Sequence, residues 1–226
     1  GAGSEERAGG HSAEAAASVP ARADMKRSRR GGGGCGFLLL ALAALGVWLY
    51  AGAYPFLARH APVASDTLVI EGWLGDDLLA QAAGWAASNG VKRIALTGGP
   101  IETGSYLVEW KTLPEMTKAR LEALGHGARF ELEAVPAQKV RRGRTRESAR
   151  ALKAEWKLER GAFNLASEGL HARRSWRAFR DEFGDGVEVG SVALTPVEYD
   201  GSDWWSCSEG VRSMIGEAVA YLYDLF

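Results

Sequence analysis

The chain has 226 residues, a formal net charge of −1 and a hydrophobic fraction of 46%. This length suits one globular domain with an appendage, and the hydrophobic fraction is sufficient for a full core. The near-zero charge argues against a general nucleic-acid binder, although it leaves room for a local basic pocket. The two cysteines, Cys35 and Cys207, lie in unrelated contexts, which disfavours a disulfide framework or a zinc site.

The first 36 residues are expected to be a disordered, basic N-terminal segment. Residues 1–24 are rich in Gly, Ala, Ser and charged side chains and show no apolar period. Met25 then opens a basic run that ends at Arg30 and is typical of the start of a membrane-targeted protein. This favours Met25 as the translation start, with the preceding residues a tag or a misassigned start.

Residues Phe37–Leu57 predict one transmembrane helix. The run is uncharged and close to the roughly 20 residues that span a bilayer, and Trp48, Tyr50 and Tyr54 near its end resemble an interfacial aromatic belt. The preceding basic cluster predicts a cytoplasmic N-terminus and an exported C-terminal domain. A cleaved signal peptide with a site at Ala51–Ala53 is the main alternative, and a buried core helix is a weaker one.

A short linker is expected at residues 58–65, followed by alternating strand and helix patterns over residues 66–226. The expected strands are Thr67–Glu71, Arg93–Leu96, Phe130–Val135, Ala162–Ala166 and Val187–Leu194. The expected helices are Asp77–Ser88, Leu113–Leu124, Arg146–Glu159, Ala172–Phe183 and Cys207–Leu225. This alternation predicts an α/β fold: a Rossmann-like, doubly wound, mostly parallel sheet of about five strands.

Two helix starts carry a spacing typical of a capping box. Thr112 is followed three residues later by Glu115, and Ser206 is followed by Glu209 at the same spacing. In such a box the hydroxyl and the carboxylate each accept a hydrogen bond from the other residue's backbone N–H. Both pairs therefore support the expected helix boundaries.

Ligands of doubly wound sheets bind beyond the carboxyl ends of the strands, so the residues that follow each strand are candidates. Gly72 and Trp73 follow the first strand, and Thr97 closes the second before Gly98 and Gly99. The glycine pair either lets the backbone approach a ligand closely or only permits a tight turn. Neither a dinucleotide fingerprint nor a P-loop is complete, so no NAD or Walker-type nucleotide site is expected, and the sequence does not identify a cofactor.

An arginine cluster at residues 141–145 stands just before a predicted helix. Arg142 and Arg144 are candidates for holding an anion, Thr145 for capping the helix, and Ser148 for facing the same cleft one turn later. The alternative is a solvated basic loop.

The segment Phe163–Ser175 repeats this pattern in a more compact form. An apolar strand ends in a turn, and His171, Arg173 and Arg174 then stand in the first turn of a helix. Arginines are unfavourable at the positive end of a helix dipole unless an anion lies among them. The segment therefore indicates an anion site, unless the arginines face solvent or acidic residues later in the helix.

Glu71 and His171 are the candidate catalytic residues. Glu71 closes an apolar strand and can act as a general base, a metal ligand, or a counter-ion for Arg144 or Arg173. His171 can move protons near neutral pH, or it can be a hydrogen-bonded structural residue. The chain has no Gly-x-Ser-x-Gly elbow, His-Glu-x-x-His motif or Cys/His cluster, so hydrolase and zinc-enzyme motifs lend no support.

The ordered combination of these segments, from about Asp66 to the C-terminus, resembles the SanA/ElyC/YdcF family of bacterial envelope proteins. The matching segments are Glu71–Trp73, Thr97–Pro100, Gly104–Tyr106, Arg141–Thr145 with Ser148–Ala149, His171–Ser175 and Trp204–Arg212. The resemblance implies a Rossmann-like fold, a domain outside the bacterial cytoplasmic membrane, and a link to envelope or peptidoglycan maintenance. It brings no catalytic assignment. Family members typically have a glycine-rich turn at the first segment and an Asn-Thr motif in place of Arg144–Thr145.

The sequence therefore supports three functional hypotheses. The first is a single-pass, membrane-anchored domain that binds an anionic, phosphorylated envelope metabolite, such as a polyprenyl phosphate, and hydrolyses it or transfers a group at phosphorus. The second is a non-catalytic ligand sensor or scaffold that uses the same cleft. The third is a structural envelope protein whose arginines form ion pairs. The expected partners are the cytoplasmic membrane and a small anionic or lipid-phosphate ligand, without nucleic acid; the sequence identifies no protein partner.

Overall fold

The computed structural model describes residues 32–225, and the predicted disordered segment before Gly32, with its basic run, lies outside them. The chain divides after Ala44 into two units. The first unit holds the beginning of helix α1 (Gly32–Leu57), and the second holds the rest of that helix and all later elements. Helix α1 begins earlier than the predicted start at Phe37.

Helix α1 is long and apolar enough to cross a membrane. The most apolar 18-residue window of its segment Gly36–Leu57 has a mean hydropathy of 2.0, and none of that window is buried. Side chains such as Phe37 and Leu40 are largely exposed. Soluble domains rarely expose a continuous apolar surface of this kind, so the exposure disfavours a buried core helix.

Within residues 32–225 the chain forms a five-stranded, all-parallel sheet in the order β3-β2-β1-β4-β5. The strands are β1 (Thr67–Glu71), β2 (Arg93–Gly98), β3 (Glu131–Pro136), β4 (Gly161–Glu168) and β5 (Val187–Leu194). All the predicted strands are therefore confirmed, with small shifts at their ends. In the register of the central strands, Val69 pairs with Ala95 on one side and Leu165 on the other.

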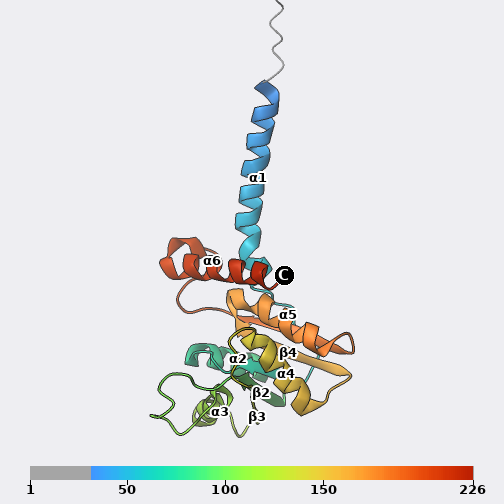
Figure 1. Cartoon of the computed structure of the whole chain (residues 1–226), viewed down its shortest axis with the longest axis vertical. Helices are drawn as coiled ribbons and strands as arrows, with labels where there is room; N and C mark the ends of the chain where they lie inside the picture. The colour runs from blue at the N-terminus through green and yellow to red at the C-terminus, as the bar shows by residue number, and fades with distance from the viewer. Residues whose placement is uncertain (1–31, 226) are drawn as a thin grey trace, which may run out of the picture. The chain divides into compact units, whose positions relative to one another are not determined.

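Helices cover both faces of the sheet, as the predicted doubly wound architecture requires. They are α2 (Asp76–Ser88), α3 (Leu113–Ala123), α4 (Arg144–Trp156) and α5 (Ala172–Phe183). Leu68 and Ile70 of β1 belong to the hydrophobic core that includes α2 and α3, whereas Val69 belongs to the core that includes α4 and α5. Because side chains alternate along a strand, β1 is apolar on both faces. Helices α4 and α5 lie side by side (Figure 1).

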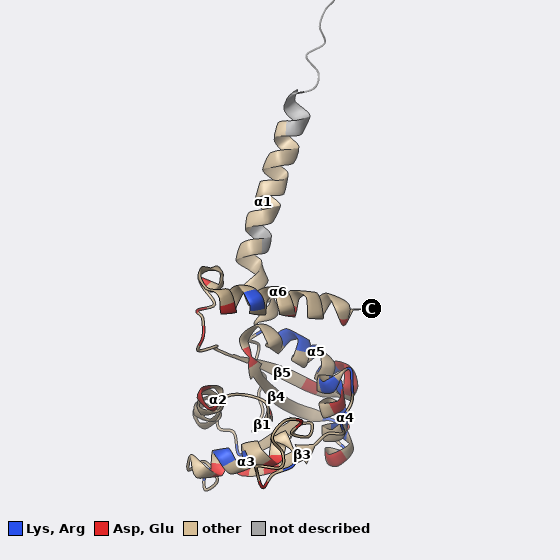
Figure 2. Cartoon of the chain, turned by 60° about the vertical axis from the view of Figure 1, so that its left-hand side comes forward, with Lys and Arg blue, Asp and Glu red and all other residues tan. Residues whose placement is uncertain are grey.

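The C-terminal helix α6 (Ser208–Tyr223) belongs to neither face of the sheet. Two short 3₁₀ helices, η1 (Gly169–His171) and η2 (Trp204–Ser206), precede α5 and α6. A third hydrophobic cluster joins Leu57, Leu170 and Met214, which come from α1, η1 and α6. Helix α6 therefore packs where the end of α1 meets the start of α5 (Figure 2).

The helix starts confirm one predicted cap and correct two others. Thr112 and Glu115 form the predicted capping box. Ser206 lies inside η2, so Cys207 caps α6 instead, and its sulfur accepts the N–H of Gly210 at 3.4 Å. Thr145 does not cap α4, because the helix already begins at Arg144 and leaves Thr145 in its first turn.

The predicted linker is fixed to the sheet. Ala61 forms an antiparallel bridge with Ser191 of β5. The fully buried Asn164 side chain of β4 accepts the N–H of Val63 at 2.8 Å and donates to its carbonyl at 2.9 Å. Gly190 of β5 leaves the space that this amide occupies, because a Cβ there would collide with Asn164 Oδ1. The chain between α1 and β1 is therefore an ordered part of the domain.

Replacing Gly190 with alanine is expected to destabilise the domain by about 1–3 kcal/mol, the range typical of overpacked cores. The new methyl group would displace the Asn164 amide and break its hydrogen bonds to Val63. Gly84→Ala is the matched control, because a Cβ at this position in α2 meets open space and alanine favours a helix. Chemical denaturation in detergent measures both variants. Equal stability of the Gly190 and Gly84 variants would contradict the docking of the linker.

Candidate functional site

A cleft with a volume of about 1500 Å³ opens at the carboxyl ends of the parallel strands. Its floor includes Glu71 at the end of β1 and Glu168 at the end of β4. These neighbouring strands connect to helices on opposite faces, so the cleft lies at the switch point where open α/β sheets bind ligands. The start of α4 and helices α5 and α6 supply the walls.

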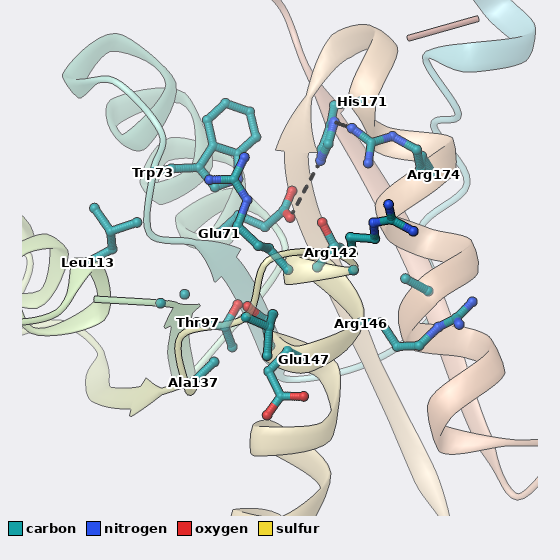
Figure 3. A pocket seen from close by; sticks show the side chains of 18 of the residues that line it. Glu71, Trp73, Thr97, Leu113, Ala137, Arg142, Arg146, Glu147, His171 and Arg174 are labelled. Atoms are coloured by element: carbon teal, nitrogen blue, oxygen red, sulfur yellow. Dashed lines mark hydrogen bonds and ion pairs between the residues drawn. The ribbon is translucent and has the colours of Figure 1, made fainter. Parts of the chain in front are cut away.

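Most of the predicted site residues line this cleft (Figure 3). They are Glu71, Trp73, Thr97, Gly98, Gly99, Arg142, Arg144, Thr145, Ser148, His171 and Arg174. Gly72 and Arg173 do not line it.

Gly72 has a packing role. Its N–H donates to the carbonyl of Thr97 at 2.7 Å, and its own carbonyl accepts the hydroxyl of Thr117 in α3 at 2.7 Å. A Cβ on Gly72 would approach the backbone carbon of Leu113 to 3.0 Å. The glycine thus lets the start of α3 pack closely against the end of β1, and the structure places it outside the lining of the cleft.

Arg173 points away from the cleft and towards α1. Its Nε donates to the carbonyl of Phe56, and its guanidinium carbon lies 3.9 Å from the centre of the Phe56 ring. Successive side chains on a helix are about 100° apart. Of the two arginines, therefore, only Arg174 faces the cleft, and the structure does not bring Arg173 to the same place.

His171 and Arg174 share one carboxylate, that of Glu217 in α6. The Nδ1 atom of His171 lies 3.0 Å from Glu217 Oε1, and the Nε atom of Arg174 lies 2.9 Å from Oε2. A second guanidinium nitrogen of Arg174 reaches Glu217 Oε1 at 3.1 Å and His171 Nδ1 at 2.9 Å. Nδ1 can therefore accept from Arg174 when the imidazole is neutral and donate to Glu217 when it is protonated.

Glu71 lies on the other side of the imidazole. Its carboxylate is buried and accepts hydrogen bonds from the hydroxyls of Ser167 and Ser175, the latter at 3.0 Å and 3.1 Å. Glu71 Oε1 is 3.8 Å from His171 Nε2, too far for a direct hydrogen bond. The structure therefore provides serines and His171 as the partners of Glu71, in place of the predicted Arg144 or Arg173.

This arrangement shifts two pKa values in opposite directions. Burial alone would lower the pKa of His171, but the Glu71 carboxylate and the hydrogen bond to Glu217 raise it above its ordinary value. Burial alone would raise the pKa of Glu217, but hydrogen bonds from His171 and Arg174 lower it to about 2. The electrostatics favour an imidazolium held between the carboxylates of Glu71 and Glu217, and Figure 3 shows the contact of His171 with Glu71.

The opposite wall of the cleft is basic. Arg141, Arg142, Arg144 and Arg146 line it, and none of them forms an ion pair within residues 32–225. They surround the N-terminus of α4, where Gly143 takes a left-handed conformation with φ of 66° and no side chain caps the helix. Free N–H groups and the helix dipole add to the positive potential there.

Thr97, at the end of β2, lines the same cleft and carries an unsatisfied hydroxyl. Its side chain is 1% exposed, and its Oγ1 atom has no hydrogen-bond partner in the described part of the chain. Leaving a buried hydroxyl without a partner costs roughly 1–3 kcal/mol. A ligand oxygen bound between β2 and α4 would supply the missing partner.

Several residues of the cleft were not predicted from the sequence. Glu217 gives one signal, as the single charged residue in the apolar stretch Met214–Tyr223. Arg146 extends the recognised arginine cluster. Ser167 does not line the cleft but binds Glu71, and it follows an apolar strand next to the predicted turn. Glu168, whose pKa is raised by burial and then by Glu198, gave no signal beyond its place after that strand.

No protein-family model, curated protein or solved structure matches the chain. The structure alone defines the class of protein. It is an α/β domain with a doubly wound parallel sheet and a charged cleft at its switch point. Among the described residues, no group of three His, Cys, Asp or Glu side chains is placed to hold a metal ion.

Glu217→Gln is expected to lower the free energy of unfolding near neutral pH by on the order of 2 kcal/mol. The folded-state pKa of Glu217 is about 2, against 4.5 for a free carboxyl, so its stabilising contribution is present above pH 4.5 and lost as pH falls towards 2. The contribution of His171 to stability depends on pH in the opposite direction. Because its pKa is raised in the folded state, His171 stabilises the fold below pH 6.5, and this stabilisation is lost as pH rises through the folded-state pKa.

Denaturant titrations from acid to neutral pH test this linkage. The difference between wild type and Glu217→Gln should shrink as pH falls below 4.5. Glu188→Gln, at an exposed position on β5, is the control and should leave stability unchanged across the same range. A Glu217→Gln difference that does not change with pH would mean that the carboxylate contributes through packing alone.

Proposed function

We propose that this protein is a membrane-anchored domain that binds an anionic, phosphorylated envelope metabolite in the cleft, and that it belongs to the SanA/ElyC/YdcF family. One observation carries the binding proposal. The unpaired arginines at the N-terminus of α4 and the unsatisfied hydroxyl of Thr97 line the same cleft. Forked guanidinium donors, free backbone N–H groups and a buried hydroxyl together suit the oxygens of a phosphate.

The proposed anchor is α1, crossing the cytoplasmic membrane once. Its length, its lack of charge and its exposed apolar side chains support this assignment. The basic run before it favours a cytoplasmic N-terminus, so the α/β domain would lie outside the cytoplasm, in a periplasm or equivalent space. A lipid phosphate such as a polyprenyl phosphate fits an anion site that is tethered to a membrane.

His171 is the proposed acid–base group of a reaction at phosphorus. Its Nε2 atom has no hydrogen-bond acceptor among the described residues, so it is available to a ligand oxygen. In hydrolysis, water would attack phosphorus while the bond to the ester oxygen breaks, and the imidazolium would donate its proton to that leaving oxygen. The proton released by the attacking water would return to His171. Glu217 would orient the imidazole through the hydrogen bond to Nδ1, and Glu71, held by two serines, would help to keep it charged.

A ligand sensor is the second candidate. The observation that favours it is that neither Glu71 nor Glu217, the carboxylates on either side of His171, is free to act as a base or a nucleophile. Both oxygens of Glu71 are engaged by serines, and both oxygens of Glu217 are engaged by His171 and Arg174. In this case the same anion would bind without being converted.

Farnesyl phosphate, a short polyprenyl phosphate, is the probe for binding. The full chain in detergent should bind it, and the double variant Arg142→Ala/Arg144→Ala should bind it at least about tenfold more weakly, equivalent to about 1.4 kcal/mol. Arg160→Ala removes an exposed arginine outside the cleft and should bind as wild type does. Isothermal titration calorimetry gives the dissociation constants. Equal affinity of a folded double variant and wild type would exclude the α4 anion site.

Turnover separates the enzyme from the sensor. If the protein is an enzyme, release of inorganic phosphate from farnesyl phosphate should fall by about a hundredfold or more in His171→Gln. The variant should still bind the probe, because the arginines of α4 remain. Wild-type binding without phosphate release from this probe would favour the sensor.

A further inference from the structure

Helix α6 carries an exposed apolar stripe formed by Ile215, Val219, Leu222 and Tyr223. Each of these side chains is more than half exposed, from 56% for Leu222 to 65% for Tyr223. Their spacing places them on one side of the helix. The buried Met214 faces the core on another side. The stripe (the α6 stripe) is therefore unpartnered within the described chain, although the rest of the helix is packed.

Contacts fix α6 against the last turns of α1, which belong to the same unit as α6. The ring centres of Phe56 and Tyr221 lie 5.4 Å apart in an edge-to-face arrangement. Ala53, Tyr54 and Leu57 also belong to the hydrophobic cluster beneath α6. Figures 1 and 2 both show α6 running across the end of α1. Wherever the end of α1 meets the lipid surface, α6 lies next to it.

Aromatic side chains gather at this junction. The Tyr50 ring lies 4.6 Å from the Trp205 ring and 5.8 Å from the Trp204 ring, measured between centroids. Tyr50 and Trp205 remain partly exposed. Amphipathic aromatic rings concentrate at the headgroup level of membranes. Tyr50 was predicted as part of an interfacial belt, and η2 adds two tryptophans next to it.

We infer that α6 lies in the lipid–water interface of the membrane that α1 crosses, with the α6 stripe in contact with lipid acyl chains. The inference rests on the proposed anchor and goes beyond it by assigning the membrane a second contact surface. An apolar helix face can insert to the boundary between headgroups and acyl chains without crossing the bilayer. We assign the α6 stripe to the lipid surface because the anchor α1 would hold α6 beside the membrane permanently. A protein partner would have to be recruited to the stripe.

The same helix forms one wall of the cleft. The residues of α6 that line the cleft are Ser213, Gly216, Glu217, Ala220 and Tyr223, so the cleft side of the helix meets the stripe at Tyr223. An interfacial α6 would therefore place that wall at headgroup level. A lipid phosphate could then enter the cleft from the membrane surface without leaving the bilayer with its acyl chain.

Apolar area, and not charge, drives this insertion. Arg212 is the single basic residue of α6, and it lies 3.9 Å from Glu209. The same helix carries Glu217, and Asp224 follows its last residue. An acidic helix gains nothing from anionic headgroups. Insertion of the α6 stripe should therefore be the same in zwitterionic and in anionic vesicles.

Depth-dependent fluorescence quenching of the full chain in vesicles tests the inference. A Cys35→Ser/Cys207→Ser background leaves one labelling site, and the serine hydroxyl at position 207 can still accept the Gly210 N–H. A fluorophore is then attached at Val219→Cys, at Leu40→Cys in α1, or at Ser88→Cys, an exposed position on α2. Nitroxide groups placed high on the lipid acyl chains act as quenchers.

The Val219 label should be quenched several-fold more than the Ser88 label, in both kinds of vesicle, and Ile215→Cys should behave as Val219→Cys does. If the Leu40 label is quenched but the Val219 and Ile215 labels are quenched no more than the Ser88 label, the inference is overturned. The proposed anchor would then remain intact. Disulfide pairing of Val219→Cys between two copies, without quenching, would also overturn it and assign the stripe to a dimer. No quenching at Leu40 would overturn the proposed anchor itself.

Discussion

The arrangement of the cleft depends on one carboxylate, that of Glu217, which accepts hydrogen bonds from both His171 and Arg174. This contact joins the C-terminal helix α6 to the turn between β4 and α5, two regions that are far apart in sequence. It also fixes the charges of the cleft. Arg174 is neutralised in place, so it is not a free anion ligand, and His171 is favoured in its charged form. The free positive charge remains on the opposite wall.

The parallel sheet explains why two charged walls face each other. Strands β1 and β4 are neighbours in space but are separated in sequence by two strands and three helices. Their carboxyl ends bring Glu71 and Glu168 to one edge, and the turn after β4 adds His171. The loop after β3 brings the arginines of α4 to the same edge. A buried acid–base pair and an exposed basic rim are therefore consequences of topology.

The sequence predicted the fold better than the geometry of the site. Burial on both faces made the strands almost continuously apolar, so their positions and parallel order followed from pattern alone. Pattern does not reveal how a helix is rotated about its axis. Arg173 and Arg174 are therefore equivalent in sequence, although one packs on Phe56 and the other lines the cleft. Glu217 was missed for a related reason, because its role depends on a tertiary contact with a distant turn.

The protonation of His171 tests the central claim, that two carboxylates hold a charged imidazole at the floor of the cleft. The full chain labelled with ¹⁵N-histidine contains four histidines, and the His171→Gln variant assigns the signal. A pH titration of the ring nitrogens should give a pKa above 6.5 for His171 and a lower value in Glu217→Gln. A His171 pKa at or below 6.5, unchanged in Glu217→Gln, would contradict the account.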